Sequence, residues 1–506
     1  MVSDLLGLEK CKKSLKESVR TFNIKGNSRF IPLKDKTISC VFTSPPYWFL
    51  RKYDIPDQIW DDDPNCEHDW GEQIKFLGKK PSHGVSSSSM TVLGVTKDIG
   101  SAGDTIWDSG FFCKKCGAWK GQLGLEPTFD LYIEHLIQIF DEVWRVMRDD
   151  GIFFLNIGDT YSTVSGSLKE GVCNSSFRSN KFGKSEKFRL DQPKTQIQDK
   201  SLCGIPFRLV TKMIDKGWRL RNTIIWQKPN GIPNSARDRF SVDFEYIFFL
   251  VKSKNYWFDQ PLEKYEKSMD RWGGETLIPK GVSTWDEGTG QSWYRARNMR
   301  PNPEGRIKRC IWKIPTKPYR EAHYACFPEK LCEEIIKAGC PEFICKACGQ
   351  PRARVIEYDK SDWLEISEDM TLDEKERVWA SRETKRVDKG LSDCGCRELT
   401  CIRCGNIIYL SNSDKKISSG EDTLPPLSGM VSGKIICEKC GCSDFDINIP
   451  WKPGLVLDPF GGSGTTMKTA RKLGRIGVSL DLGYHELSSE RSKTTQLSWN
   501  DCYESM

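Results

Sequence analysis

The chain has 506 residues, of which 38% are hydrophobic and 29% charged, as is typical of soluble globular proteins. Its longest apolar run, Tyr246 to Val251, is far shorter than the roughly 18 residues that a membrane-spanning helix requires. The formal charge of +7 permits a polyanionic partner but does not demand one.

Strands and helices are predicted to alternate along the chain. A strand at 37–42 comes first, and apolar residues at helical spacing follow over 129–148. Asp149-Asp150-Gly151 is expected to close that helix before a strand. The later elements are a strand at 152–157, a helix after 204, strands at 220–226 and 245–251, and a closing strand–turn–helix–strand at 454–457, 465–473 and 476–481. This order favours an α/β fold.

The turn between the last two strands carries a glycine-rich motif, Asp458-Pro459-Phe460-Gly461-Gly462-Ser463-Gly464-Thr465-Thr466. Glycines after a strand let the backbone approach a ligand closely. A P-loop would place a lysine after Gly464, and none is there, so the motif favours a nucleoside without a triphosphate. Asp481 ends the next strand, where its carboxylate can accept hydrogen bonds from both ribose hydroxyls.

The first strand runs directly into Thr43-Ser44-Pro45-Pro46-Tyr47-Trp48. Two prolines have fixed φ and no N–H, so Ser44 to Tyr47 forms a rigid segment, here called the proline ledge. The Ser44 hydroxyl and the Pro45 carbonyl can each accept one hydrogen of an amine on a nucleobase, and Tyr47 can stack on the base. A turn that merely ends a strand is the alternative.

The proline ledge followed by the glycine-rich motif resembles S-adenosylmethionine (SAM)-dependent DNA amino-methyltransferases of the circularly permuted β group, in which the catalytic motif comes first. Serine at position 44, where other members have Asp or Asn before the two prolines, resembles the motif of the N4-cytosine members. Similar segments lie between the two motifs: Leu155 to Tyr161, Ile224 to Asn230 and His323 to Pro328. The resemblance covers most of the chain outside 350–449. One departure is Gly461, where the usual turn has alanine.

The resemblance implies a Rossmann-like, circularly permuted SAM-dependent methyltransferase sheet with zinc-binding insertions. It implies catalytic roles for Ser44, Pro45, Pro46 and Tyr47. It also implies SAM contacts from Thr43, Phe327, Pro328, Asp458, Pro459, Phe460, Gly461, Gly462, Ser463, Gly464, Thr465, Thr466 and Asp481. Lys228, within the second similar segment, could contact a phosphate or be a solvated side chain.

The expected function is site-specific methylation of cytosine N4 in double-stranded DNA by a cytoplasmic protein of prokaryotic or phage origin. Adenine N6 methylation and a non-catalytic zinc-ribbon DNA-binding protein are the alternatives. C5-cytosine chemistry needs a thiolate, usually in a Pro-Cys motif, and none of the 21 cysteines follows a proline. A restriction endonuclease acting on the same site is an expected partner, and a membrane is not.

The cysteines include four Cys-x-x-Cys pairs, whose spacing lets one knuckle present two sulfurs to a tetrahedral metal ion. Three structural zinc sets are predicted: Cys66, His68, Cys113 and Cys116; Cys345, Cys348, Cys394 and Cys396; and Cys401, Cys404, Cys437 and Cys440. Pairing between the second and third sets stays open, as does Cys442 in place of Cys440. Free thiols or a redox pair are the alternatives.

The motifs, the composition and the resemblance together imply several segments along the chain. They are 1–60 (core with the catalytic motif), 61–120 (zinc knuckle), 121–258 (core), 259–308 (target recognition), 309–340 (core near the cofactor), 341–449 (double zinc ribbon) and 450–506 (SAM-binding core). Lys and Ser at 162–200, and Arg and Trp at 259–308, are candidate DNA contacts, although either segment could be a solvated loop.

Overall fold

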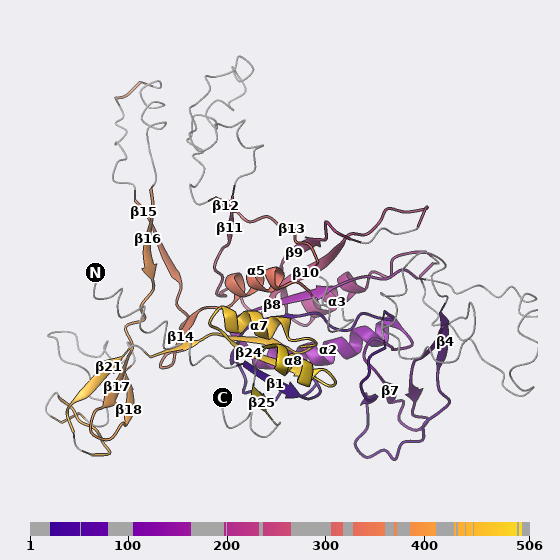
Figure 1. Cartoon of the computed structure of the whole chain (residues 1–506), viewed down its shortest axis with the longest axis horizontal. Helices are drawn as coiled ribbons and strands as arrows, with labels where there is room; N and C mark the ends of the chain where they lie inside the picture. The colour runs from indigo at the N-terminus through magenta and orange to yellow at the C-terminus, as the bar shows by residue number, and fades with distance from the viewer. Residues whose placement is uncertain are drawn as a thin grey trace, which may run out of the picture. The chain divides into compact units, whose positions relative to one another are not determined.

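The computed structural model describes residues 21–50, 52–78, 105–162, 197–198, 200–231, 236–264, 305–316, 327–359, 369–371, 385–410, 430–431, 434–440, 442–448, 450–492 and 495–497 (Figure 1). The chain divides into two compact units, the first made of 1–256, 310–340 and 454–506 and the second of 257–309 and 341–453. Most of the two candidate DNA-contacting segments, and His323 to Cys326, lie outside the described residues.

The first unit is built on a nine-stranded sheet with the order β13-β9-β10-β8-β2-β23-β24-β1-β25. From β8 to β25 all neighbours are parallel, whereas β10 runs antiparallel to β8 and β9. The strands are β1 (Thr21–Lys25), β2 (Ile38–Thr43), β8 (Met147–Ile157), β9 (Arg219–Gln227), β10 (Phe244–Val251), β13 (Ile311–Lys313), β23 (Leu455–Asp458), β24 (Ile476–Asp481) and β25 (Thr495–Leu497).

The centre of this sheet joins the beginning of the chain to its end. β2 pairs with β23 through Cys40 and Val456 and through Val41 and Leu457. On their other sides, β2 pairs with β8 and β23 pairs with β24, so the chain leaves in opposite directions from this pair. Such a switch point is where open α/β sheets bind ligands. The predicted permuted α/β sheet is confirmed.

Both faces of the sheet are buried by helices (Figure 1). Val41 and Phe153 belong to the cluster under α2 and α3, and their neighbours Phe42 and Phe154 belong to the cluster under α5 and α7. Because successive strand residues face opposite sides, a sheet covered twice needs continuous apolar runs. The helices are α2 (Phe129–Val146), α3 (Ile205–Asp215), α5 (Glu329–Gly339), α7 (Thr465–Lys472) and α8 (His485–Ser492).

The helix predicted over 129–148 ends earlier than expected. Thr128 caps its start by accepting a hydrogen bond from Leu131 N at 3.2 Å, but α2 stops at Val146 and β8 begins at Met147. The acids expected to end the helix therefore lie in the strand. Arg148 donates to both oxygens of Asp150 at 2.7 and 2.8 Å, because residues i and i+2 share one face of a strand.

Several elements escaped the sequence analysis. The strand expected to come first, at 37–42, is preceded by β1, whose Asn23 is 2% exposed and donates to Ser489 Oγ at 3.1 Å. Tertiary partners thus bury a polar strand that composition does not reveal. β13, α5, α8 and β25 were not predicted either, since each is short or mixed in character.

An insertion between β2 and α2 forms small antiparallel sheets. One has the order β3-β7-β6 and the other pairs β4 with β5. Their bounds are β3 (Gln58–Trp60), β4 (Lys75–Gly78), β5 (Thr105–Asp108), β6 (Phe111–Phe112) and β7 (Trp119–Gly121). Trp60 and Trp119 are 1% and 0% exposed, so this insertion is packed into the core of the first unit.

The second unit consists of short antiparallel pairs and one three-stranded sheet, β18-β17-β21. Its strands are β11 (Leu262–Glu263), β12 (Arg306–Ile307), β14 (Phe343–Cys345), β15 (Arg354–Asp359), β16 (Lys385–Leu391), β17 (Arg397–Cys401), β18 (Ile407–Leu410), β19 (Met430–Val431), β20 (Lys434–Ile435), β21 (Phe445–Asn448) and β22 (Trp451–Pro453). Across the described parts of both units, no helix combines the length and apolar character of a membrane span.

Candidate functional site

The two sequence motifs meet at the carboxyl ends of β2 and β23. Thr43 Oγ1 donates a hydrogen bond to Asp458 Oδ1 at 2.6 Å, although 415 positions separate the two residues. The proline ledge begins at the next residue after Thr43. The glycine-rich motif, from here on called the glycine turn, begins at Asp458. This one bond therefore joins the starts of both motifs.

Asp458 is 1% exposed and collects three donors. Besides Thr43, Thr466 Oγ1 donates to Oδ2 at 2.7 Å and Phe460 N donates to Oδ1 at 3.1 Å. Burial raises the pKa of Asp458 to about 6, although these three donors oppose the shift. The carboxylate thus clamps the glycine turn and the start of α7 to β2.

The glycine turn is too tight for side chains at two positions. A Cβ at Gly461 would lie 2.6 Å from Ser479 Cβ, which accounts for glycine where the resembling family has alanine. Gly464 has φ +74°, and a Cβ there would lie 3.1 Å from the Ser488 carbonyl oxygen. Gly461, Gly462 and Ser463 of this turn line a pocket.

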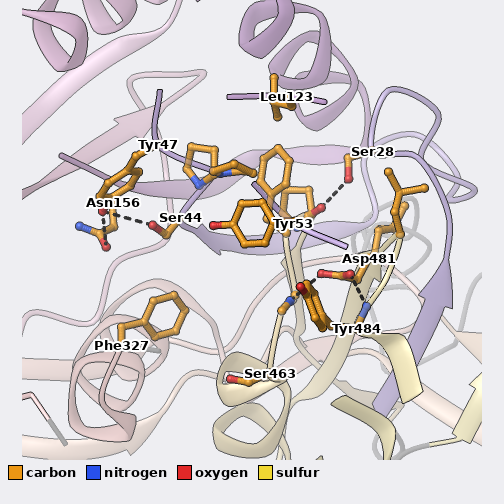
Figure 2. Close-up of a pocket in the computed structure, with 18 of the residues that line it drawn as sticks. Ser28, Ser44, Tyr47, Tyr53, Leu123, Asn156, Phe327, Ser463, Asp481 and Tyr484 are labelled. Carbon is orange, nitrogen blue, oxygen red and sulfur yellow. Dashed lines mark hydrogen bonds between the residues drawn. The ribbon is translucent and has the colours of Figure 1, made fainter. Parts of the chain in front are cut away.

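Asp481 ends β24 beside this turn, as predicted. Its oxygens accept hydrogen bonds from Gly462 N at 2.9 Å, Gly483 N at 2.9 Å and Tyr484 N at 2.7 Å. These bonds fix the carboxylate at the pocket wall, where Tyr53 and Tyr484 also lie (Figure 2). An acid beside two aromatic rings, which meet edge to face with centroids 6.3 Å apart, suits a nucleoside, whose ribose hydroxyls donate and whose base stacks.

One cavity of about 610 Å³ is lined by both motifs, a volume in the usual range for small-molecule sites. Lining residues predicted from sequence are Ser44, Pro45, Pro46, Tyr47, Phe327, Pro459, Phe460, Gly461, Gly462, Ser463, Thr465 and Asp481. Thr43, Asp458 and Thr466 lie beneath it in the buried clamp. Gly464 is the N-cap residue of α7, and Pro328 is that of α5.

At the end of the pocket that holds the proline ledge, Ser44 Oγ donates to Tyr47 Oη at 3.3 Å, and Tyr47 Oη donates to Glu245 Oε2 at 2.7 Å. Burial and the Glu245 carboxylate raise the pKa of Tyr47 well above its usual value, so the phenol stays protonated. A Cβ at Gly158 would lie 2.8 Å from Tyr47 Cε2, so only glycine lets the ring lie against β8.

The sequence analysis missed Glu245. Besides the bond from Tyr47, the Glu245 carboxylate accepts a hydrogen bond from Asn156 Nδ2 at 3.0 Å and forms an ion pair with Lys228. Lys228 is therefore not a solvated lysine. β10 runs antiparallel to β8, so the first residues of β10 lie at the same edge as the last residues of β8. An acid opening an otherwise apolar strand was the available signal.

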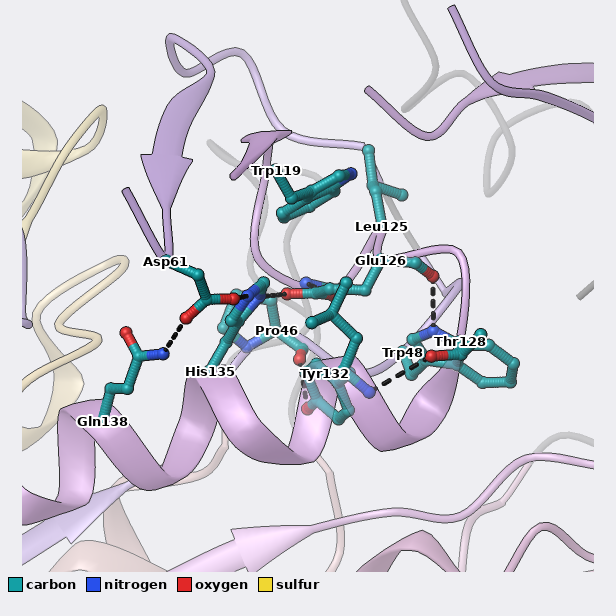
Figure 3. Close-up of polar contacts among 12 residues, drawn as sticks. Pro46, Trp48, Asp61, Trp119, Leu125, Glu126, Thr128, Tyr132, His135 and Gln138 are labelled. Carbon is teal, nitrogen blue, oxygen red and sulfur yellow. Dashed lines mark hydrogen bonds and ion pairs between the residues drawn. The ribbon is translucent and has the colours of Figure 1, made fainter. Parts of the chain in front are cut away.

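The proline ledge is held from behind by α2 and the segment before it (Figure 3). Tyr132 Oη donates to the Pro46 carbonyl at 2.6 Å, and Trp48 Nε1 donates to the Glu126 carbonyl at 2.9 Å. The bond from Tyr132 uses the carbonyl of Pro46. It does not use the carbonyl of Pro45, which is the acceptor predicted for a base amine.

Buried His135 connects this support to the cysteine-containing insertion. Its Nδ1 lies 2.9 Å from Glu126 Oε1 and its Nε2 lies 3.0 Å from Asp61 Oδ2 (Figure 3). The ring stacks with Trp60 and Trp119 at centroid distances of 4.3 and 5.3 Å. Since Asp61 and both tryptophans belong to the insertion, the insertion contributes directly to the packing behind the proline ledge.

The structure brings together all three predicted cysteine sets. Within each set, the sulfur or nitrogen atoms all lie within 4.8 Å of one another. Cys66 and Cys113 sulfurs are 3.9 Å apart, close to the edge of about 3.8 Å expected for a tetrahedral zinc–sulfur site. Cys442 contacts Asp444 instead of joining the third set.

Comparison with known proteins identifies the family. A family model described as DNA methylase, for N6 and N4 methyltransferases, matches residues 38–344. The Type II methyltransferase M.Cfr9I of Citrobacter freundii is 31% identical over 61% of this chain and 68% of its own length. M.SfiI of Streptomyces fimbriatus is 28% identical over 90% of this chain and 86% of its own length. The aligned segment spans 62% to 68% of the first three curated relatives.

The solved PvuII DNA methyltransferase (cytosine-N4-specific) is 12% identical with a TM-score of 0.38, over 96% of this chain and 92% of that chain. A score this low adds nothing to the assignment. The permuted sheet, with the proline ledge and the glycine turn in one crevice, defines the class of DNA amino-methyltransferases. The chain belongs to the N6/N4 DNA methylase family.

The Asp458 clamp makes a stability prediction. Thr466→Val keeps the side-chain volume but leaves a buried carboxylate with one donor fewer, so the free energy of unfolding should fall by about 1–3 kcal/mol. Chemical denaturation would measure this loss. Thr466→Ser keeps the hydroxyl, so its free energy of unfolding should fall clearly less. Equal losses in the two variants would contradict a role for the hydroxyl.

Proposed function

We propose that the protein transfers a methyl group from SAM to N4 of cytosine in double-stranded DNA. The observation that carries the proposal is the single pocket lined by both the proline ledge and the glycine turn. The serine of the ledge supports cytosine over adenine through its resemblance to N4-cytosine enzymes. Because its relatives are Type II methyltransferases, we further propose a partner endonuclease for the same site.

The glycine turn and Asp481 are the proposed SAM-binding half. SAM would supply an electrophilic methyl group. The fixed Asp481 carboxylate would accept hydrogen bonds from the ribose hydroxyls, and Tyr53 and Tyr484, whose rings meet edge to face, would offer one aromatic surface to the nucleoside. The absence of a Cβ atom at Gly462 leaves room for close approach to its backbone, and Phe327 lines the same pocket.

The proline ledge is the proposed base-holding half. An amine stacked in a duplex is unreachable, so the cytosine must leave the helix before reacting. Ser44 Oγ and the Pro45 carbonyl would accept the two amine hydrogens, which turns the nitrogen lone pair toward the incoming methyl. Tyr47 would stack on the base, and its contact with Glu245 would hold the ring in place. Positioning and electrostatics would supply most of the rate acceleration.

The identity of the methylated base is the direct test. Plasmid DNA incubated with the enzyme and isotope-labelled SAM should, after digestion to nucleosides, yield N4-methylcytosine by mass spectrometry. N6-methyladenine would replace the cytosine proposal by its alternative, and no labelled base would favour a DNA-binding protein. Ser44→Ala should lower the methylation rate by about 100-fold with SAM affinity kept. Ser253→Ala, at an exposed turn after β10, is the matched control.

Tyr47 variants separate stacking from hydrogen bonding. Tyr47→Phe keeps the ring but loses the bonds to Ser44 and Glu245, so single-turnover methylation should slow by about tenfold. Tyr47→Ala also removes base stacking and should slow the reaction by about another tenfold. If Tyr47→Ala matched the wild-type rate, the proline ledge would not be the base-holding surface.

We also propose that each cysteine set holds one structural zinc ion. All four ligands in each set are protein atoms, so no coordination position remains for catalysis. Bound zinc would contribute to folding, because the ligands are far apart in the unfolded chain.

Metal content tests this assignment. The purified protein should contain about three zinc ions per chain by elemental analysis, and a strong chelator should lower its melting temperature. Cys404→Ser should lose one zinc ion, whereas Cys442→Ser, in the neighbouring knuckle but outside the set, should lose none. Loss of zinc from Cys442→Ser would show that the third set is paired differently.

A further inference from the structure

The loop between β9 and β10 begins and ends at the pocket. Lys228 and Asn230 line the pocket at its start, and Glu245 lines it just beyond its end. Lys228 N donates to the Asp243 carbonyl at 2.7 Å, which closes the base of the loop. The two ends of the loop are therefore fixed beside the pocket.

Phe240 projects from this loop and is 97% exposed, more than any other large apolar side chain among the described residues. Single exposed apolar residues are common and by themselves need no explanation. Phe240, however, lies close in the chain to a residue that lines the pocket. Glu245 comes five positions after Phe240, so their Cα atoms are at most about 17 Å apart.

The residues just before Phe240 are charged and hold the loop to residues that follow β8. The Arg239 guanidinium lies 3.5 Å from the centroid of the Tyr161 ring, just beyond the end of β8. Asp238 forms an ion pair of 2.9 Å with Lys200. Arg237 and Arg239, which precede Phe240 in the chain, are both exposed. A cationic surface with one protruding aromatic ring complements a duplex, whose phosphates are anionic and whose base stack is apolar.

A base that enters the pocket leaves a gap in the duplex, and apolar side chains inserted between base steps stabilise such openings. We propose that Phe240 is the wedge that occupies the gap left by the flipped base, with Arg237 contacting an adjacent phosphate. This inference rests on the proposed methylation of a base extruded from duplex DNA. It assigns a DNA-contacting surface to residues that the sequence analysis did not single out.

The test compares two forms of one short duplex, whose recognition site is first mapped by sequencing plasmid DNA methylated by the wild-type enzyme. In one form the target base is paired, and in the other it faces an abasic position. Phe240→Ala should slow single-turnover methylation of the paired duplex by about 10- to 100-fold, because the open state loses its wedge. On the abasic duplex no base pair must be broken, so the methylation rate of the variant should lie within about threefold of the wild-type rate.

Two further variants sharpen the comparison. Val242→Ala changes a 52% exposed apolar residue of the same loop and should leave both rates unchanged. Arg237→Ala should weaken binding of both duplexes alike and reduce the salt dependence of affinity by about one charge. SAM affinity should be the same in all variants, since none of these three residues lines the pocket.

The proposed wedge role is overturned if Phe240→Ala methylates the paired duplex at the wild-type rate. It is also overturned if the substitution lowers the methylation rate equally on the two duplexes. The second result would make Phe240 an ordinary contact, or a contact for another protein. These outcomes differ from failure of the proposed function, in which the wild-type enzyme itself would transfer no methyl group to either duplex.

Discussion

The hydrogen bond from Thr43 to Asp458 is the interaction on which the rest of the site depends. It lies at the centre of the sheet, and both partners are essentially inaccessible to water. Side chains alternate along a strand, so a register shift of one residue would turn Thr43 to the opposite face and separate the two motifs. The bond therefore specifies the pairing that brings the proline ledge to the glycine turn.

This arrangement explains why a permuted chain can form a complete crevice. Strand pairing sets which segments are neighbours, and order along the chain does not enter. Asp458 then serves two elements at once, because Thr43 comes from β2 and Thr466 from α7. A carboxylate with acceptor positions on both oxygens suits that junction better than a side chain with a single polar atom.

The proline ledge depends on more distant parts of the chain than its rigid prolines suggest. Tyr132 holds it from α2, and Glu245 positions Tyr47 from β10. Behind Tyr132, the His135 network brings in Asp61 from the cysteine-containing insertion. An insertion that looks separable in sequence thus packs against the core, since Trp60 and Trp119 are buried there.

The sequence by itself determined the α/β class and the two motifs that line the pocket. These follow from local signals, namely apolar runs, paired prolines and glycines after a strand, whereas the permuted order came from the family resemblance. Cysteine spacing likewise predicted the three sets that the structure brings together. Only the tertiary structure decided that Asn23 is buried, that α2 ends at Val146, and that Glu245 holds Tyr47. Each of those depends on a partner far along the chain, and local patterns carry no information about which distant group will satisfy a polar side chain.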